Sequence, residues 1–214
     1  MVRLFFCNRG YNARVMPQRY RTILLFGRPG SGKGTIGKVL GAVPGFFHMA
    51  CGDTFRTLDL STELGKIFAD YSSRGELVPD ESTVKLWKVT CNAQVDTHRY
   101  RPDSDLLILD GIPRNLEQAK LMEEYIKVER VFHLVCTDEA EMMARLRRRA
   151  LRENRFDDAS EDVIRHRWQV YTDETRPVLN FYAPEKIERV DAMGSPAKVI
   201  HDILGRMMGW GLIK

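Results

Sequence analysis

Residues 27–35 read Gly-Arg-Pro-Gly-Ser-Gly-Lys-Gly-Thr, and this stretch decides the fold of the chain. A short apolar run, Thr22–Phe26, precedes it, and a helix-like segment, Ile36–Val43, follows it. Strand, glycine-rich loop and helix in this order are the context of a phosphate-binding loop. Glycines let several backbone N–H groups point at one anion, and the helix N-terminus adds partial positive charge. Lys33 supplies a full charge for the outer phosphates, and Thr35 follows one residue later than is usual.

Apolar runs alternate with helical periodicity along the rest of the chain. This alternation predicts an α/β fold, namely a doubly wound five-stranded parallel sheet with helices on both faces. Ligands of such sheets bind beyond the carboxyl ends of the strands. Apolar helical stripes, such as the one containing Ile164, Trp168 and Tyr171, are interpreted as core packing. The expected strands are Thr22–Phe26, Phe46–Met49, Leu106–Leu109, Val131–Val135 and Ile187–Val190.

Composition is that of one globular domain. The chain has 214 residues, of which 43% are hydrophobic and 29% charged, and no apolar run approaches the ~20 residues of a membrane span. The four cysteines are scattered and include no Cys-x-x-Cys pair. This pattern argues against a disulfide framework or a zinc site, and it is typical of a reducing cytosol. We therefore expect a cytoplasmic protein with no membrane partner.

Basic residues are concentrated at the start of the chain. Residues 1–52 carry eight Lys or Arg and no acidic residue, within a net charge of +4 for the whole chain. A nucleotide pocket accounts for part of this excess. We interpret residues 1–21, which hold five arginines, as a loosely ordered basic N-terminal extension. A targeting peptide, a basic arm or an overlong gene start with Met16 as initiator stay open. The domain is expected at 22–208, with a C-terminal tail at 209–214.

A second phosphate-site signal is the run Leu106–Asp110. Four apolar residues and then an aspartate describe a buried strand that delivers a carboxylate to its C-terminal end, where Asp110 would hold Mg²⁺ or its waters. Arg114 follows, and Gln118 comes four residues later. A helix opened by Pro113 would place both on one face, so an anion clamp and an amide are expected together.

Arginines are dense in the second half of the chain. A basic run favours nucleic acid as a partner, but carboxylates are interleaved here and stacking aromatics are missing. Arginines around a transferred phosphoryl group fit better, because that transition state is stabilised mainly by positioned positive charge. The stretch 145–158 is the most polar of the chain, and we expect a mobile arm there rather than core.

Taken in order, these motifs resemble those of the nucleoside monophosphate kinases, and of the adenylate kinases in particular. The resemblance spans about residues 22–207, nearly the whole chain. It implies a P-loop domain with a small NMP-binding insert at about 51–80 and a short, zinc-free lid at about 149–158. The matching motifs are Gly27–Thr35, Gly52-Asp53-x-x-Arg56, Gly75-Glu76-Leu77-Val78-Pro79, Asp110-Gly111-Ile112-Pro113-Arg114 with Gln118, and Arg155-Phe156-Asp157-Asp158 leading to Arg167.

The resemblance implies an ATP-dependent phosphotransferase that moves the γ-phosphoryl group of Mg-ATP to a nucleoside monophosphate, with AMP favoured, giving two ADP. It implies Mg²⁺ as cofactor, held through water by Asp110, and no zinc. The expected partners of this monomer are ATP, AMP and ADP, not nucleic acid. Arg145 would stack on the ATP base. The ATP-binding residues implied are Gly30, Ser31, Gly32, Lys33, Gly34, Thr35, Arg145 and Arg149.

The resemblance also implies an acceptor site and a catalytic set without a protein nucleophile. Arg56 and Arg114 would grip the acceptor phosphate, and Gln118 would hydrogen-bond its base. Asp157 and Asp158 would help to lock the lid. The AMP-binding residues implied are Gly52, Asp53, Arg56, Leu77, Val78, Gly111, Arg114, Gln118, Arg155 and Arg167. The catalytic residues implied are Lys33, Arg114, Arg149, Arg155 and Arg167.

Departures from the family pattern keep alternatives open. Ala50-Cys51 stands where adenylate kinases usually carry Ser-Thr, and the asparagine after Arg114, Asn115, is similar to the pattern of the pyrimidine kinases. Gln118 favours AMP. Arg28 replaces a small residue or proline in the phosphate-binding loop, with no evident role. The alternatives are a UMP/CMP kinase, another small-acceptor P-loop kinase, or a non-catalytic nucleotide-binding module, which the presence of Lys33 and Asp110 disfavours.

Overall fold

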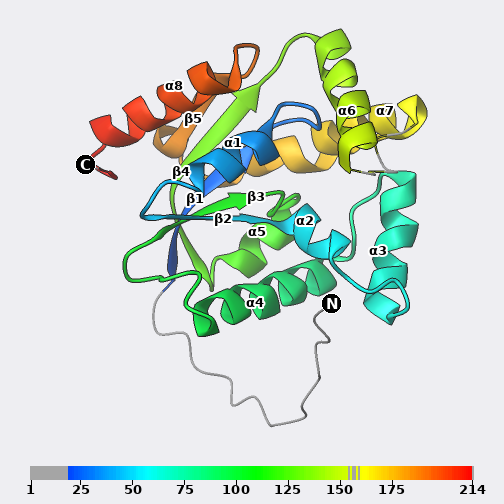
Figure 1. The fold of residues 1–214 in the computed structure, drawn as a ribbon, viewed down its shortest axis with the longest axis horizontal. Coiled ribbons are helices and arrows are strands. Elements are labelled where there is room, and N and C mark those ends of the chain that lie inside the picture. The colour runs from blue at the N-terminus through cyan, green and yellow to red at the C-terminus, as the bar shows by residue number, and fades with distance from the viewer. Residues whose placement is uncertain (1–18, 154, 156–157, 159, 214) are drawn as a thin grey trace.

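The computed structural model describes residues 19–153, 155, 158 and 160–213. Strands and helices alternate along most of the chain, and the strands form one central sheet (Figure 1). In chain order the elements are β1 (Tyr20–Phe26), α1 (Lys33–Leu40), β2 (Phe46–Ala50), α2 (Cys51–Arg56), α3 (Glu63–Arg74), α4 (Asp80–Asp96), β3 (Leu106–Asp110), α5 (Leu116–Met122), β4 (Ile126–Val135), α6 (Glu139–Glu153), α7 (Glu161–Val170), η2 (Tyr171–Thr175), η3 (Arg176–Phe181), η4 (Pro184–Lys186), β5 (Ile187–Asp191) and α8 (Pro196–Gly209).

The five strands lie in the order β2-β3-β1-β4-β5, and every neighbouring pair is parallel. The predicted doubly wound α/β fold is therefore confirmed. Leu25 on β1 and Ala50 on β2 both stand opposite Asp110 on β3. The carboxyl ends of these three strands consequently meet at one edge, where the phosphate-binding loop and the Asp110 carboxylate come together.

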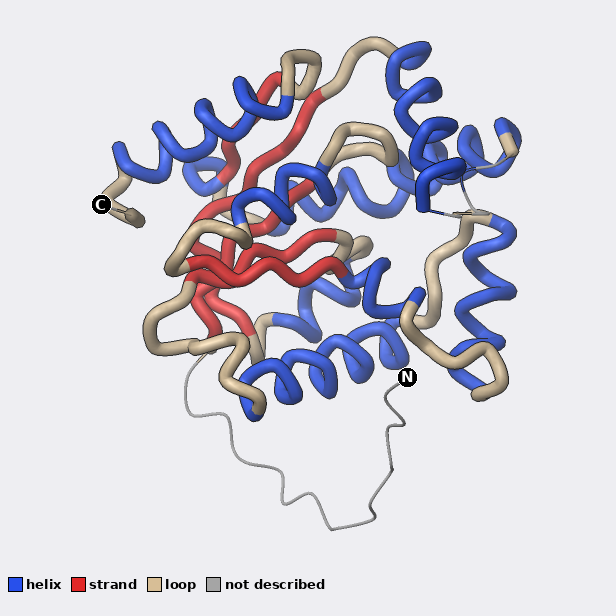
Figure 2. The backbone as a smooth tube through the Cα atoms, in the orientation of Figure 1, coloured by secondary structure: helices blue, strands red, loops and turns tan. Residues whose placement is uncertain are grey.

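Helices cover both faces of the sheet, with α1 and α8 on one face and α4 and α5 on the other (Figures 1 and 2). Alternate residues of β1 serve the two cores. Leu24 and Phe26 belong to the cluster on the side of α4 and α5, whereas Ile23 and Leu25 belong to the cluster on the side of α1 and α8. Such burial on both faces explains why the strands are continuous apolar runs in the sequence. Burial of each large side chain contributes roughly 1.5–3 kcal/mol to the stability of the fold.

The first strand begins earlier than expected. Tyr20 is buried, and its ring centroid lies 6.5 Å from that of Trp87 and 5.3 Å from that of Tyr100. Arg21 pairs with Glu129 of β4 at 3.1 Å. The predicted boundary between an extension at 1–21 and a domain starting at 22 is therefore wrong by two residues. The interpretation of residues 1–18 lies outside the described part of the chain.

The C-terminal end of the domain also extends further than expected. Helix α8 runs through Gly209, and the Trp210 ring stacks on Phe132 with 5.7 Å between centroids. Leu212 and Ile213 pack against the same core cluster. The predicted tail at 209–214 is thus, over its described residues, part of the packed domain, because its apolar side chains cover that core.

The polar stretch predicted to be a mobile arm is mostly helix. Residues 145–153 belong to helix α6, whose Met142 and Leu146 side chains are buried. These side chains join Ile164 and Trp168 of α7 in a small separate core. Although most side chains of α6 are charged, an apolar residue recurs at every fourth position, and this is enough to pack one face of the helix. No helix within the described ranges is long and apolar enough to cross a membrane.

Candidate active site

A cavity of about 860 Å³ opens over the phosphate-binding loop, and a smaller one of about 60 Å³ shares part of its wall. The larger cavity brings together most residues expected in the site. These are Gly30, Ser31, Gly32, Lys33, Gly34, Thr35, Gly52, Asp53, Arg56, Leu77, Asp110, Gly111, Arg114, Arg145, Arg149, Arg155 and Arg167. The smaller cavity is lined by Gly52, Arg56, Leu77, Val78, Gly111, Arg114, Gln118 and Arg167 among others.

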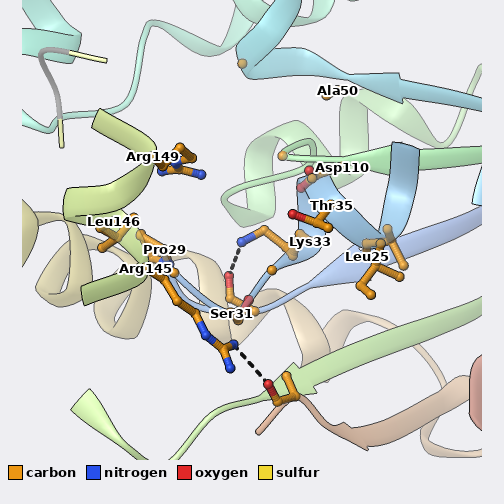
Figure 3. A pocket seen from close by; sticks show the side chains of 18 of the residues that line it. Leu25, Pro29, Ser31, Lys33, Thr35, Ala50, Asp110, Arg145, Leu146 and Arg149 are labelled. Atoms are coloured by element: carbon orange, nitrogen blue, oxygen red, sulfur yellow. Dashed lines mark hydrogen bonds between the residues drawn. The ribbon is translucent and has the colours of Figure 1, made fainter. Parts of the chain in front are cut away.

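The phosphate-binding loop ends directly in helix α1. Gly30 and Gly32 both have φ of 92°, a conformation that glycine adopts without strain, and Gly32 is the N-cap of α1. The helix therefore begins at Lys33, three residues earlier than predicted. Lys33 Nζ donates to the carbonyl oxygens of Gly27 at 2.6 Å and Arg28 at 3.3 Å. The ammonium thus folds over the loop at the floor of the cavity (Figure 3).

The site holds an excess of positive charge around Lys33. Desolvation, together with the positive charges of Arg114, Arg149 and Arg167, lowers the pKa of Lys33 to about 8. The carboxylate of Asp110 acts in the opposite direction. A cation held in this state is stabilised by any anion that enters, and a phosphate group is an anion of the right size.

Asp110 lies at the end of β3 and is only 8% exposed. Its side chain lies beside Lys33 and Thr35, across the cavity from Arg149 (Figure 3). A Cβ atom on Gly34 would stand 3.6 Å from its Oδ2, so the loop backbone approaches the carboxylate closely. No group of three or more His, Cys, Asp or Glu residues could hold a metal within the ranges described. A cation here would rely on Asp110 together with substrate phosphates and water, which is the ligand set Mg²⁺ prefers.

The arginines beyond the loop are held by two carboxylates. Asp158 is 0% exposed and accepts from Arg149 at Nε (2.7 Å) and at a terminal nitrogen (3.0 Å), and also from Arg167. Arg155 donates to Oδ1 of Asp53 at 2.9 Å. An ion pair therefore joins Arg155, in the stretch expected to be the lid, to Asp53, in the stretch expected to be the acceptor insert. Asp157, expected to help lock the lid, lies outside the described residues.

The segment around Arg114 differs from the prediction. Helix α5 begins at Leu116 with Asn115 as its N-cap, so Arg114 precedes the helix and does not share a helix face with Gln118. Arg114 folds back, and its Nε donates to the carbonyl oxygen of Gly111 at 2.9 Å. Arg114 and Gln118 still meet, because the Arg114 backbone N–H donates to Oε1 of Gln118 at 2.8 Å.

The amide of Gln118 is fixed in place by its neighbours. Gln118 is 1% exposed, and its Nε2 donates to Oδ1 of Asp80 at 2.8 Å. Asn115 donates to the same oxygen at 2.8 Å, so its side chain serves the helix cap and Asp80. Asp80 carries no motif signal in the sequence, and only the fold brings it to this amide. The oxygen and the NH₂ group of Gln118 each keep capacity for one further hydrogen bond.

One part of the smaller cavity's lining is apolar. Leu77, Val78 and Cys51 line it, with Phe55 and Phe68 stacked behind at 5.1 Å between centroids. Burial raises the pKa of the Cys51 thiol to about 11, so the thiol is neutral at physiological pH. The cavity therefore offers an apolar wall beside the Gln118 amide, and the guanidinium groups of Arg56 and Arg114 also line it.

Arg145, on helix α6, lines the larger cavity. Its Nε donates to Glu141 at 2.9 Å and a terminal nitrogen donates to the carbonyl oxygen of Ala192 at 3.0 Å (Figure 3). These bonds hold the guanidinium plane at the wall formed by α6 and the segment after β5. Arg145 thus lines the larger cavity together with the phosphate-binding loop, whereas Gln118 lines the smaller cavity that shares part of its wall.

Comparison with known proteins agrees with this arrangement. A family model described as adenylate kinase matches residues 25–187. The adenylate kinase of Thermobifida fusca is 39% identical over 180 residues, which cover 80% of this chain and 90% of that protein. The adenylate kinase of Clavibacter michiganensis is 36% identical over 197 residues, which cover 89% of this chain and 94% of that protein. The adenylate kinase of Flavobacterium psychrophilum is 33% identical over 180 residues, which cover 81% of this chain and 90% of that protein. The resemblance predicted from the motifs is confirmed: the chain belongs to the adenylate kinase family of ATP-dependent phosphotransferases.

Proposed function

We propose that this protein transfers the γ-phosphoryl group of Mg-ATP to AMP and releases two molecules of ADP. The observation that carries the proposal is the convergence of cationic side chains from distant segments on one cavity over the phosphate-binding loop. These side chains are Lys33, Arg56, Arg114, Arg149, Arg155 and Arg167. Phosphoryl transfer needs its two substrates in line and its spreading negative charge stabilised, and positioned cations supply both.

ATP would occupy the end of the cavity walled by α6. Backbone N–H groups of Gly30–Thr35 would hold its phosphates, with Lys33 exchanging its carbonyl partners for phosphate oxygens. Arg145 would stack on the base, since its two hydrogen bonds already hold the guanidinium. Arg149 and Arg167 would approach the transferred group from the lid side. No protein nucleophile is required.

AMP would occupy the end that leads to the smaller cavity. Arg56 and Arg114 would bind its phosphate, with Gly52 and Gly111 allowing close approach of the backbone. The adenine ring would lie against Leu77 and Val78 and meet the remaining hydrogen-bonding capacity of Gln118. Because Asp80 fixes the Gln118 amide before the substrate arrives, little ordering remains to be done on binding.

Mg²⁺ fits the carboxylate end of β3. Asp110 would hold the ion through water, and the ion would supply neutralisation of the phosphate oxygens. Residues 51–80 would serve as the acceptor-binding insert and 149–158 as a lid whose closure excludes water. We further propose that the protein works as a monomer in the cytoplasm, on nucleotides and not on nucleic acid.

A pyrimidine acceptor is the alternative that one residue still favours. Cys51 lacks the hydroxyl group that adenylate kinases usually present at this position. Asn115, the other pyrimidine-like residue, caps α5 and bonds to Asp80, and it lines neither cavity. Of these two positions Cys51 alone lines a cavity and supports a pyrimidine acceptor, whereas the Gln118 amide in the same cavity supports AMP.

A coupled assay of ADP formation from Mg-ATP with AMP, GMP, CMP or UMP tests the proposal. We expect AMP to give the highest kcat/KM. Lys33→Met, purified in parallel, is the control for contaminating host kinases, and it should be nearly inactive. CMP or UMP as the better substrate would assign the protein to the pyrimidine kinases. Nucleotide binding without turnover of any monophosphate would assign it as a non-catalytic module.

A further inference from the structure

We propose that Arg28 and Trp168 are positioning residues that fasten the phosphate-binding loop to the two helices bearing the lid-side arginines. The inference rests on the proposed function, because it concerns the geometry of the same transfer step. Arg28 occupies a loop position where a small residue or proline is usual, and Trp168 directly follows Arg167. The structure brings these two side chains together across 140 residues of sequence.

Arg28 reaches out of the loop to both helices. Its terminal nitrogen donates to Oε1 of Glu139, the first residue of α6, at 2.8 Å. Its guanidinium carbon lies 5.7 Å from the centroid of the Trp168 ring on α7, within the range of a cation–π contact. One side chain of the loop therefore touches α6 and α7 at once.

Trp168 grips the loop backbone directly. The indole is 5% exposed, and its Nε1 donates to the carbonyl oxygen of Pro29 at 3.0 Å. Its ring belongs to the small core that α6 and α7 share, together with Met142, Leu146 and Ile164. Because that core fixes the ring, the hydrogen bond ties the loop to a rigid element and not to a loose side chain.

Close packing of the next loop residue completes the attachment. A Cβ atom on Gly30 would stand 3.0 Å from the carbonyl oxygen of Met142 and 3.1 Å from its Cβ. The loop backbone thus lies directly against α6. An ion pair, an indole hydrogen bond and this contact hold three consecutive loop residues, 28–30, against the same two helices.

The consequence concerns Lys33 and Arg167. Lys33 begins α1 three residues after the fastened segment, and Arg167 precedes Trp168 on α7. Both cations would act on the same transferred group, so their separation must be held closely. A misplacement of about 1 Å at such a site costs on the order of 10²-fold in rate. The contacts of Arg28 and Trp168 set this separation before any nucleotide binds.

Two variants test the idea. Trp168→Phe keeps an aromatic ring in the core and removes the N–H donor, whereas Arg28→Ala removes an ion pair from a side chain that is one-third exposed. Arg21→Ala is the matched control, because Arg21 forms a comparable Arg–Glu pair at 3.1 Å at the opposite end of β1. Each variant is assayed for kcat and both KM values and for urea unfolding.

We expect kcat to fall about five-fold in each variant, the rate equivalent of one net hydrogen bond, with KM for AMP within about two-fold. Arg21→Ala should keep the wild-type kcat. In the double variant the two losses should not multiply, because both act on one loop. A loss of unfolding free energy with an unchanged kcat would overturn the proposal and leave Trp168 as a core residue only.

Hydrogen exchange of the ligand-free protein gives a readout that needs no reaction. The segment 27–34 should exchange faster in Trp168→Phe and in Arg28→Ala than in the wild type or Arg21→Ala. Unchanged exchange there in both variants would also overturn the proposal. Failure of the wild type to phosphorylate any monophosphate would instead refute the proposed function, and the exchange experiment would still decide whether the loop is fastened.

Discussion

Replacing Lys33 with methionine should separate its role in the reaction from its effect on the fold. Methionine matches the length of the apolar stem and removes the charge. In the folded, ligand-free protein the pKa of Lys33 is lowered from 10.5 to about 8. Below pH 8 the folded state must therefore carry a charge that it disfavours, at a cost of up to about 3 kcal/mol. The bonds to Gly27 and Arg28 return about 1 kcal/mol each.

The sign of the pH dependence follows from this depressed pKa. The cost is fully present below pH 8, shrinks as pH rises from 8 towards 10.5, and vanishes above the unfolded-state value. Relative to Lys33→Met, the wild type should therefore gain up to about 2 kcal/mol in unfolding free energy between about pH 7 and about pH 9.5. At pH 7 the variant should be at least as stable as the wild type, although it loses turnover by ~10²-fold or more.

Urea unfolding at both pH values, with turnover measured on the same samples, checks these expectations. Lys120→Met is the control, because Lys120 is exposed and pairs with Glu117 on the surface at 3.5 Å. It should follow the pH dependence of the wild type. Identical pH dependence in wild type and Lys33→Met would refute the charge argument. Near-normal turnover of Lys33→Met would refute the assignment of this lysine to the phosphates.

Other perturbations test the acceptor site, the lid and the metal. Gln118→Ala should lose roughly 1–3 kcal/mol of the preference for AMP over CMP in kcat/KM, because a polar edge of the base is left unpaired. Asp158→Asn should lower the unfolding free energy by about 3 kcal/mol and reduce kcat, because two arginines lose a buried carboxylate. Urea unfolding and steady-state kinetics measure the two effects, and no change in either would contradict this role of Asp158. A chelator should stop turnover and added Mg²⁺ should restore it, while metal analysis of the purified protein finds no stoichiometric zinc.

The sequence was most informative where backbone chemistry is local. Glycines at 30 and 32 are required by positive φ angles, and the apolar run before Asp110 is required by burial on both faces of a central strand. Such requirements leave a pattern within a few residues. The five strands, their parallel pairing in one sheet and a ligand site beyond their carboxyl ends could therefore be predicted without coordinates, whereas the order of the strands could not.

Contacts between distant segments left no such pattern. Asp80 meets Gln118 across 38 positions, and Trp168 meets Pro29 across 139. In the sequence Trp168 is one member of an apolar stripe, and its N–H donor gives no signal of its own. The helix expected from Pro113 likewise began later, because the Asn115 side chain caps the backbone more effectively than a preceding proline. These details depend on which side chain reaches which backbone group.

The ligand-free site also explains why carboxylates stand among its cations. Asp53 lies within ion-pair distance of Lys38, Arg56 and Arg155, and Asp158 holds Arg149 and Arg167. Without such partners, several guanidinium groups around one cavity would repel one another and separate. Asp53 lies in the proposed acceptor insert and Arg155 in the proposed lid, so the carboxylate that restrains the charge also joins these two residues. A phosphate entering this cavity would compete with Asp53 and Asp158 for the same cations, so we expect nucleotide binding to weaken the ion pair between Asp53 and Arg155.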